Sequence, residues 1–244
     1  MKRLTIVVAY LSLFWLITGK AGIMANVTRV IYHQGDKERS VLLANTNSYP
    51  VIVQNWVDHG EANPQTETPF VVLAPIFHLP AQKIQAIRII YNGDHLPADR
   101  ESVFWLNLYE IPPNLHDQAL NQDNPKVSLA MNTQLKLFYR PTTLADFPAK
   151  LADKITFKLQ QKGEEWVLVC KNPLPFHISF SQIFFESPHK RYLIKRQMDM
   201  MIPPFSERIY HFEQSFSQQA GRIVFSYLND AGFSMREVAI FQTP

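Results

Sequence analysis

Short runs in which apolar and polar residues alternate recur along the whole chain, and they are separated by turn-forming residues. The runs are rich in Val, Ile, Phe and Tyr, and no long segment keeps an apolar period of 3.6 residues. This pattern predicts an all-β protein. In the first half the predicted strands are Val27–Tyr32, Ser40–Asn45, Val51–Asp58, Phe70–Leu73, Ile84–Tyr91, Val103–Glu110 and Val127–Tyr139.

The strand pattern stops near Pro141 and then starts again. The later predicted strands are Ile155–Gln160, Glu165–Lys171, His177–Glu186, Arg191–Lys195, Ser206–Phe212, Gly221–Asn229 and Arg236–Gln242. About seven short strands make one immunoglobulin-like sandwich, and a proline ends ladder pairing. We therefore expect two immunoglobulin-like β-sandwich domains, residues 22–141 and 142–244, joined by a short linker and forming a bent molecule with a cleft.

The segment Val127–Pro141 is predicted to be one long strand with two parts. Its first part places Val127, Leu129 and Met131 on one face, because successive side chains of a strand point to opposite sides. Its second part places Lys136 between two leucines, so this cation faces away from them. Such a strand can pair with another chain and bind an anion at its basic end. The alternative is an ordinary half-buried strand that packs against its own core.

The N-terminal segment has the pattern of a secretory signal peptide. Two basic residues precede the mostly apolar run Leu4–Ile17, which is shorter than the ~20 residues of a membrane span. We expect residues 1–21 to be removed on export, with no membrane insertion; an uncleaved anchor is the alternative. Cleavage after Ala21 places Gly19 and Ala21 at the two small-residue positions, whereas cleavage after Ala25 would place bulky Ile23 there. We prefer cleavage after Ala21.

Charge and cysteine content narrow the possible functions. Removal of Lys2, Arg3 and Lys20 with the leader lowers the formal net charge from +3 to zero, so no general affinity for nucleic acid or membrane surfaces follows. The single cysteine, Cys170, cannot form an intramolecular disulfide, and it lies in an apolar run. We expect it to be a buried, inert thiol, with a reactive thiol as the alternative.

The chain lacks the usual short motifs of catalysis. It contains no Gly-rich phosphate loop, no G-x-S-x-G and no H-E-x-x-H, and its eight histidines have no ligand-like spacing. We therefore expect no enzyme activity, no metal and no cofactor. A metal site assembled from residues that are distant in sequence stays an alternative.

Two long segments resemble a known family. Arg100–Pro113 and Asn132–Pro141 are similar to the signature of the periplasmic pilus-assembly chaperones, the PapD-like family. Shorter similarities occur throughout the rest of the chain, at Thr28–Tyr32, Asn45–Asn47, Gln54–Val57, Pro69–Val72, Lys171–Pro173 and Tyr227–Asp230.

The resemblance implies a fold and a function. Members of that family consist of two immunoglobulin-like domains in a boomerang arrangement, and they work in the periplasm of Gram-negative bacteria without ATP. They bind pilin (fimbrial) subunits by donor strand complementation and deliver them to an outer-membrane usher for pilus assembly. By this resemblance, Val127, Leu129 and Met131 are the donor-strand residues that fill the subunit's hydrophobic groove.

The resemblance also assigns roles to five charged residues. Arg29 and Lys136 match the two cations that bind the C-terminal carboxylate of the pilin. Glu101, Arg140 and Asp230 match the interdomain salt bridge that holds the angle between the domains. The alternative for each of these residues is a solvated surface charge.

Two other functions compete with the chaperone interpretation. The chain could be a fimbrial subunit or secreted β-sandwich adhesin, although a subunit is expected to carry an alternating N-terminal extension, which the sequence GIMANVTR does not show. It could also be a carbohydrate-binding or hydrolytic β-sandwich protein, which would need an aromatic platform or paired carboxylates at a cleft. Trp56, Trp105 and Trp166 do not discriminate, because each can be a core aromatic.

Overall fold

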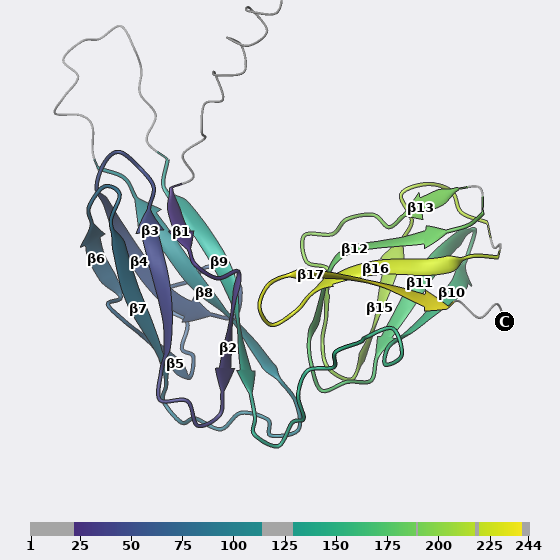
Figure 1. The fold of residues 1–244 in the computed structure, drawn as a ribbon, viewed down its shortest axis with the longest axis horizontal. Helices are drawn as coiled ribbons and strands as arrows, with labels where there is room; N and C mark the ends of the chain where they lie inside the picture. Colours follow the sequence, from purple (N-terminus) through teal and green to yellow (C-terminus); the bar gives the residue numbers. More distant parts are fainter. Residues whose placement is uncertain (1–21, 114–128, 189, 218–219, 241–244) are drawn as a thin grey trace, which may run out of the picture.

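The computed structural model describes residues 22–113, 129–188, 190–217 and 220–240, and every regular element in these ranges is a β-strand. The prediction of an all-β protein is confirmed. The strands form two lobes that meet at an angle (Figure 1). In the same ranges, no helix is long and apolar enough to cross a bilayer.

The first lobe is a sandwich of two sheets. One sheet has the order β1 (Ile23–Ala25), β3 (Arg39–Asn45), β7 (Ile84–Tyr91) and β5 (Phe70–Leu73). The other has the order β2 (Arg29–His33), β9 (Met131–Arg140), β8 (Ser102–Ile111), β4 (Val51–Asp58) and β6 (Ile76–Leu79). The β2–β9 pairing is parallel, and all other pairings in this lobe are antiparallel.

The core of the first lobe follows from the period-two pattern of its strands. In β4, Val51, Val53 and Val57 are buried, whereas Ile52 between them is exposed. Leu106 and Leu108 of β8 pack into the same core, while the side chain of Asn107 between them points to the opposite face of the sheet. Each fully buried aliphatic side chain contributes about 1.5–3 kcal/mol relative to an exposed one, so the alternation fixes which face of each strand turns inward.

The second lobe is also a two-sheet sandwich. A three-stranded sheet contains, in order, β10 (Thr156–Lys162), β11 (Glu165–Asn172) and β15 (Ser206–His211). The facing sheet has the order β13 (Arg191–Leu193), β12 (Ile178–Glu186), β16 (Arg222–Leu228) and β17 (Ser234–Ile240), with β14 (Met201–Ile202) also paired to β12. Cys170 lies fully buried in its core, where burial raises the pKa of the thiol.

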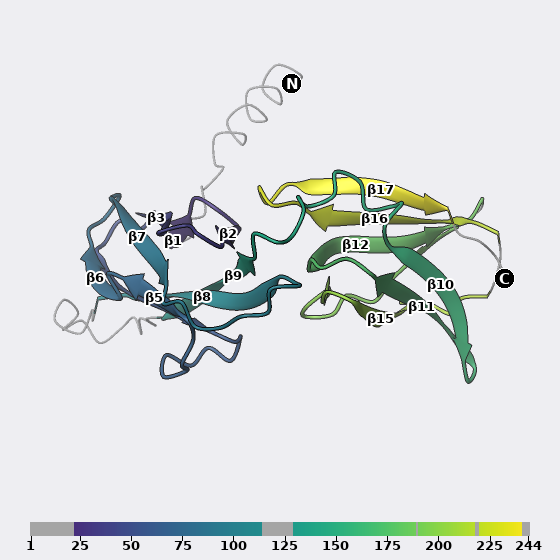
Figure 2. The same cartoon turned by 90° about the horizontal axis from the view of Figure 1, so that it is seen from below.

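The two lobes meet at a small set of specific contacts. The Glu101 N–H donates to the Pro175 carbonyl across the junction at 2.9 Å. The turn between β16 and β17 reaches toward β2 in both views (Figures 1 and 2). In this turn Gly232 has φ +82°, and a Cβ there would collide with the side chain of Thr28. The two hydrophobic cores divide between Tyr139 and Leu151.

The predicted strands agree closely with the observed ones. Each overlaps an observed strand, and β4, β5 and β7 have the predicted bounds. The short strands β1, β6 and β14 were not predicted, because two to four residues are too few to show an alternation.

The predicted strand that starts at Val127 needs a correction. The observed strand β9 begins at Met131, so Leu129 and Ala130 precede it, and Val127 lies outside the described residues. The physical reason for the later start lies in β8, the strand that pairs with β9. Met131 is opposite Glu110 near the end of β8, and Pro112 and Pro113 follow directly. Proline lacks the N–H that would extend the ladder.

Candidate functional site

The apolar face of β9 extends beyond the sandwich to which the strand belongs. Leu135 and Leu137 are buried in the first core, whereas Met131 on the same face is 45% exposed. Leu129, two residues earlier, is 72% exposed. One row of side chains therefore begins in solvent and ends in the hydrophobic core.

One edge of β9 is open along this exposed half. Strand β2 pairs with β9 only from Lys136 onward, and β1 pairs with β3 instead. No other strand among the described residues pairs with that edge of β9 at Met131–Leu135. The N–H and C=O groups of this edge are available to an added strand.

The opposite face of β9 is held by a polar network that sequence reasoning missed. The side-chain amides of Asn132 and Gln134 donate to Oδ1 of Asn107 at 2.8 and 3.0 Å. Asn107 in turn donates to the buried carboxylate of Asp58 at 2.9 Å. These bonds fix which face of β9 turns toward Asn107, because turning the strand over would leave buried polar groups unpaired.

The two predicted anion-binding cations lie side by side. Arg29 of β2 and Lys136 of β9 are direct partners in the parallel pairing, so both side chains leave the same face of the sheet. The Lys136 Nζ lies 2.8 Å from Oδ1 of Asp199, which belongs to the second lobe. A guanidinium Nη of Arg29 donates to the Leu228 carbonyl of the second lobe at 3.1 Å. Both cations therefore span the junction.

Arg29 is a buried cation with unused hydrogen-bonding capacity. It is 9% exposed, and its Nε has no hydrogen-bond partner in the described part of the chain. Burial lowers the pKa of Arg29, and the charges of Asp230 and Glu101 partly oppose that shift. A guanidinium has five N–H donors, so Arg29 retains donors for an incoming acceptor.

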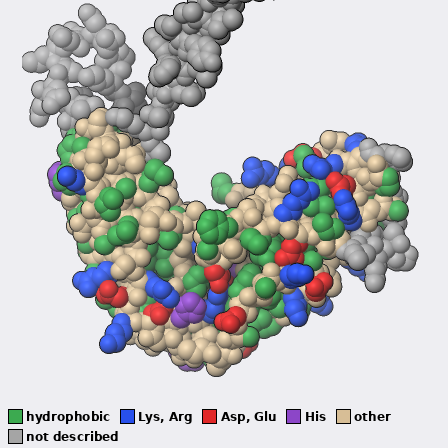
Figure 3. All heavy atoms as spheres, viewed as in Figure 1, with side chains coloured by type: hydrophobic (Ala, Val, Ile, Leu, Met, Phe, Trp, Pro, Cys, Tyr) green, Lys and Arg blue, Asp and Glu red, His purple; other side chains and the backbone are tan. Residues whose placement is uncertain are grey.

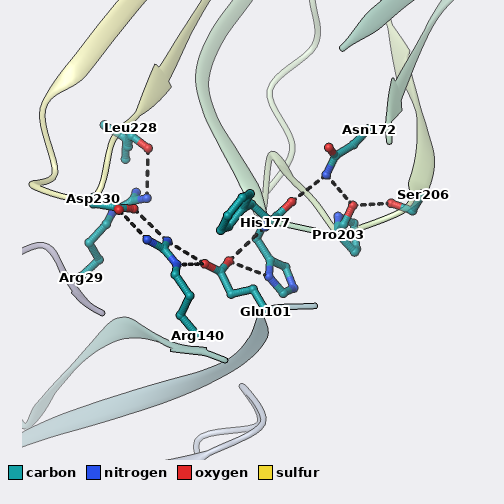
Figure 4. A network of polar contacts seen from close by, with 10 residues as sticks. Arg29, Glu101, Arg140, Asn172, His177, Pro203, Ser206, Leu228 and Asp230 are labelled. Carbon is teal, nitrogen blue, oxygen red and sulfur yellow. Dashed lines mark hydrogen bonds and ion pairs between the residues drawn. The ribbon is translucent and has the colours of Figure 1, made fainter. Parts of the chain in front are cut away.

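Glu101, Arg140 and Asp230 form one ion-paired cluster at the junction (Figure 4). Arg140 donates to Glu101 at 2.8 and 3.2 Å and to Asp230 at 2.6 and 3.0 Å. Glu101 also accepts from the main-chain N–H of His177 at 3.0 Å, and its Oε1 lies 2.9 Å from the His177 Nδ1. Residues of both lobes are thus joined through one guanidinium.

The charge state of Arg140 follows from two opposing effects. Burial, the largest single influence, lowers the pKa of Arg140, but the hydrogen bonds and charges of Asp230 and Glu101 together outweigh it and raise the pKa. Its guanidinium also lies 5.0 Å from the centre of the Phe176 ring. Arg140 therefore carries its positive charge at neutral pH despite its burial.

Asp199 completes the site, and sequence reasoning missed it. Its Oδ1, which contacts Lys136, also accepts the Met201 N–H at 3.0 Å. The Arg208 side chain donates to the carbonyls of Asp199 and Met201 and so holds the loop. An aspartate in an irregular loop gives no sequence signal for a contact with a strand 63 residues earlier.

Charged side chains of both signs gather where the lobes meet (Figure 3). The three cations Arg29, Lys136 and Arg140 face the three carboxylates of Glu101, Asp199 and Asp230. An additional carboxylate can bind here if it uses the free donors of Arg29 and competes with Asp199 for Lys136. No cluster of three or more metal-ligating side chains occurs in the described ranges.

Comparisons with known proteins point to one family. Residues 22–145 match the family described as pili and flagellar-assembly chaperone, PapD N-terminal domain, and residues 150–239 match the pili assembly chaperone PapD, C-terminal domain. The chaperone protein HifB of Haemophilus influenzae is 31% identical over 229 residues, which are 92% of this chain and 90% of HifB. The probable fimbrial chaperone YadV of Escherichia coli strain K12 is 33% identical over 218 residues, 87% of each chain.

Solved structures have the same fold. The crystal structure of the YadV chaperone superposes with a TM-score of 0.75 at 32% identity, covering 90% of this chain and 99% of that one. The CupB2 chaperone of Pseudomonas aeruginosa gives a TM-score of 0.73 at 25% identity, covering 90% of this chain and all of that one.

Proposed function

Since this chain belongs to the PapD family of pilus-assembly chaperones, we propose that it binds fimbrial subunits by lending them the exposed start of β9. Its partners are pilin subunits and the outer-membrane usher that receives them. The probable fimbrial chaperone YadV, which this chain matches over 87% of its length, supports this function.

The observation that carries the proposal is the apolar face of β9 that continues into solvent beside an open edge. Main-chain hydrogen bonds from Met131–Leu135 supply affinity, and Leu129 and Met131 fill successive pockets of a subunit that lacks one strand. Val127, which lies outside the described residues, continues the same period-two pattern in the sequence.

Arg29 and Lys136 are the anchor for the subunit's C-terminal carboxylate. They lie where the exposed half of β9 meets the junction, so a bound chain end fixes which subunit residue meets which donor side chain. Register matters here, because a slip of one residue turns every side chain to the opposite face. Charge-assisted hydrogen bonds of about 1.5–3 kcal/mol each are available to such an anchor.

Glu101, Arg140 and Asp230 hold the angle between the lobes and do not contact the subunit. Arg140 is the last residue of β9. Of its two partners, Glu101 directly precedes β8 and Asp230 lies in the β16–β17 turn. The ion pairs therefore tie the donor strand to the second lobe. With domains at residues 22–141 and 142–244, these ion pairs lie at the junction between the two domains.

We propose the periplasm of a Gram-negative bacterium as the location, reached through a signal peptide at residues 1–21. Membership of the chaperone family supports this compartment. The same membership leaves the alternatives of a fimbrial subunit, an adhesin or a carbohydrate-binding protein without support.

Affinity purification from periplasm that co-expresses candidate fimbrial subunits of the same source tests the function. The tagged wild type is compared with Lys136→Ala and with Lys158→Ala, which removes an exposed lysine of the second lobe and serves as the matched control. Subunits should co-purify with the wild type and the control and be lost with Lys136→Ala, at equal yield of folded chaperone.

The other outcomes separate the two parts of the proposal. Equal recovery of subunits with all three proteins would remove Lys136 from the anchor but leave the chaperone function in place. Recovery with none of them, at normal folded yield and with the subunits present, would overturn the chaperone function.

A further inference from the structure

Glu110 is a buried carboxylate that has only neutral partners in the described part of the chain. It is 5% exposed and lies near the end of β8. One oxygen accepts the Ile23 main-chain N–H at 2.8 Å, and the other accepts the Asn47 side-chain amide at 2.7 Å. No lysine, arginine or histidine in the described ranges forms an ion pair with it. A buried carboxylate is costly without a cation.

The residue directly before Ile23 is held in place by hydrogen bonds and close packing. Gly22 is buried, and its carbonyl accepts both the Thr46 N–H at 3.0 Å and the Thr46 hydroxyl at 2.7 Å. It has φ +77°, and a Cβ there would lie 2.5 Å from Oε2 of Glu110 and 2.9 Å from the terminal methyl of Met131. Only glycine fits this position.

We propose that Gly22 is the N-terminal residue of the exported protein and that its α-ammonium pairs with Glu110. A leader peptidase hydrolyses the Ala21–Gly22 peptide bond with water. The hydroxyl group goes to the Ala21 carbonyl and a hydrogen goes to the Gly22 nitrogen, which becomes an ammonium at neutral pH. That nitrogen is one residue from the Ile23 nitrogen already bonded to Glu110. Cleavage thus creates the cation that Glu110 lacks. The inference rests on the proposed export of the chain.

Cleavage after Ala25 does not fit the same observations. It would remove all of β1, including the buried side chain of Ile23, and with it the pairing of β1 to β3. Glu110 would lose the Ile23 N–H as well and keep only the amide of Asn47.

The site also lies against the donor segment. Glu110 is the direct partner of Met131, the first residue of β9, and the Met131 methyl adjoins Gly22. Removal of the leader therefore places a buried ion pair under the start of β9. The unprocessed chain cannot form this pair, because its Gly22 nitrogen is an uncharged amide.

N-terminal sequencing and intact mass of the protein purified from periplasm test the cleavage position. The expected first residue is Gly22. A start at Asn26, or at any other residue, would overturn the inference.

The pKa of the α-amine tests the ion pair. After reductive methylation with ¹³C-formaldehyde, an NMR titration of the amine should give a pKa above the usual range of about 7.7–8.0. Glu110→Gln should return the pKa to that range, whereas Glu67→Gln, which changes an exposed glutamate, should leave it raised. A precursor with one alanine inserted before Gly22 moves the charge while keeping Glu110 intact, and it should also give an ordinary pKa. An ordinary pKa in the wild type would refute the pair.

Subunit co-purification with the same samples separates this inference from the proposed function. A Gly22 start and a raised amine pKa without subunit binding would leave the inference standing and refute the chaperone function. Subunit binding by a protein that starts at another residue would support the chaperone function and refute the inference.

Discussion

Replacing Arg140 with alanine should destabilise the protein mainly through Glu101 and not through Asp230. The guanidinium is shared by both carboxylates, but their environments differ. The Glu101 side chain is 2% exposed, whereas that of Asp230 is 42% exposed. In Arg140→Ala, Glu101 would remain buried with only His177 as a hydrogen-bond partner, and Asp230 would be hydrated.

The expected magnitudes follow from that difference. Removing one partner of a buried ion pair costs about 3–5 kcal/mol, because the remaining charge is uncompensated. The exposed Asp230 pair is screened by solvent and contributes about 0.5–1 kcal/mol. Arg140→Ala should therefore lower the free energy of unfolding by about 3–5 kcal/mol, and Asp230→Asn by about 1 kcal/mol or less.

Urea unfolding followed by tryptophan fluorescence measures these values, since Trp105 lies in the first lobe and Trp166 in the second. Two double-mutant cycles separate the partners. The coupling of Arg140→Ala with Glu101→Gln should be about 2–3 kcal/mol, and that with Asp230→Asn below about 1 kcal/mol. A cost of Arg140→Ala below about 1 kcal/mol, or a larger coupling to Asp230 than to Glu101, would refute the reasoning.

Three further predictions concern the donor segment, the anchor and the thiol. Met131→Ser and Leu129→Ser should each weaken subunit binding about 10- to 150-fold in calorimetry, because each removes about 1.5–3 kcal/mol of favourable free energy from burying an apolar side chain in the subunit. The free energy of unfolding should change by less than about 0.5 kcal/mol, since both side chains are exposed in the free protein. Asp199→Asn should strengthen binding of a subunit with a free C-terminal carboxylate about 2- to 5-fold, because it removes a partly exposed carboxylate that competes for Lys136. An equal gain for a C-terminally amidated subunit would contradict this role. Cys170 should not react with a maleimide in the folded protein and should react fully in guanidinium chloride, since burial raises the pKa of its thiol; rapid labelling of the folded protein would show that the thiol is accessible.

The sequence predicts the strands well because alternation is a local property. The bounds of β4 and β5 can be read from the period of their apolar residues, since those residues line the core. The start of β9 could not be read this way. Its first paired residue depends on where β8 ends, at Ile111 just before Pro112, and this is a property of the partner strand.

The same distinction, between local patterns and contacts with distant residues, applies to the candidate site. Lys136, Glu101 and Arg140 lie in the two long segments that resemble the family, and Arg29 and Asp230 lie in two of the shorter ones. The structure places all five together at the junction. Asp199 and Glu110 act through contacts with residues far away in the chain, 63 positions for Lys136 and 87 for Ile23. Glu110 lies in the long segment Arg100–Pro113, but the resemblance gives it no role, because only the folded chain brings the partners of such residues within reach.

Amide hydrogen exchange of Met131–Leu135, measured on the free protein and on its complex with a fimbrial subunit, tests the central claim most directly. In the free protein the amides of this segment that point to the open edge of β9 should exchange quickly, because the strand has no partner on that side. Strong protection of these amides in the complex would show that the subunit pairs with β9. A complex in which they exchange as fast as in the free protein would contradict strand donation.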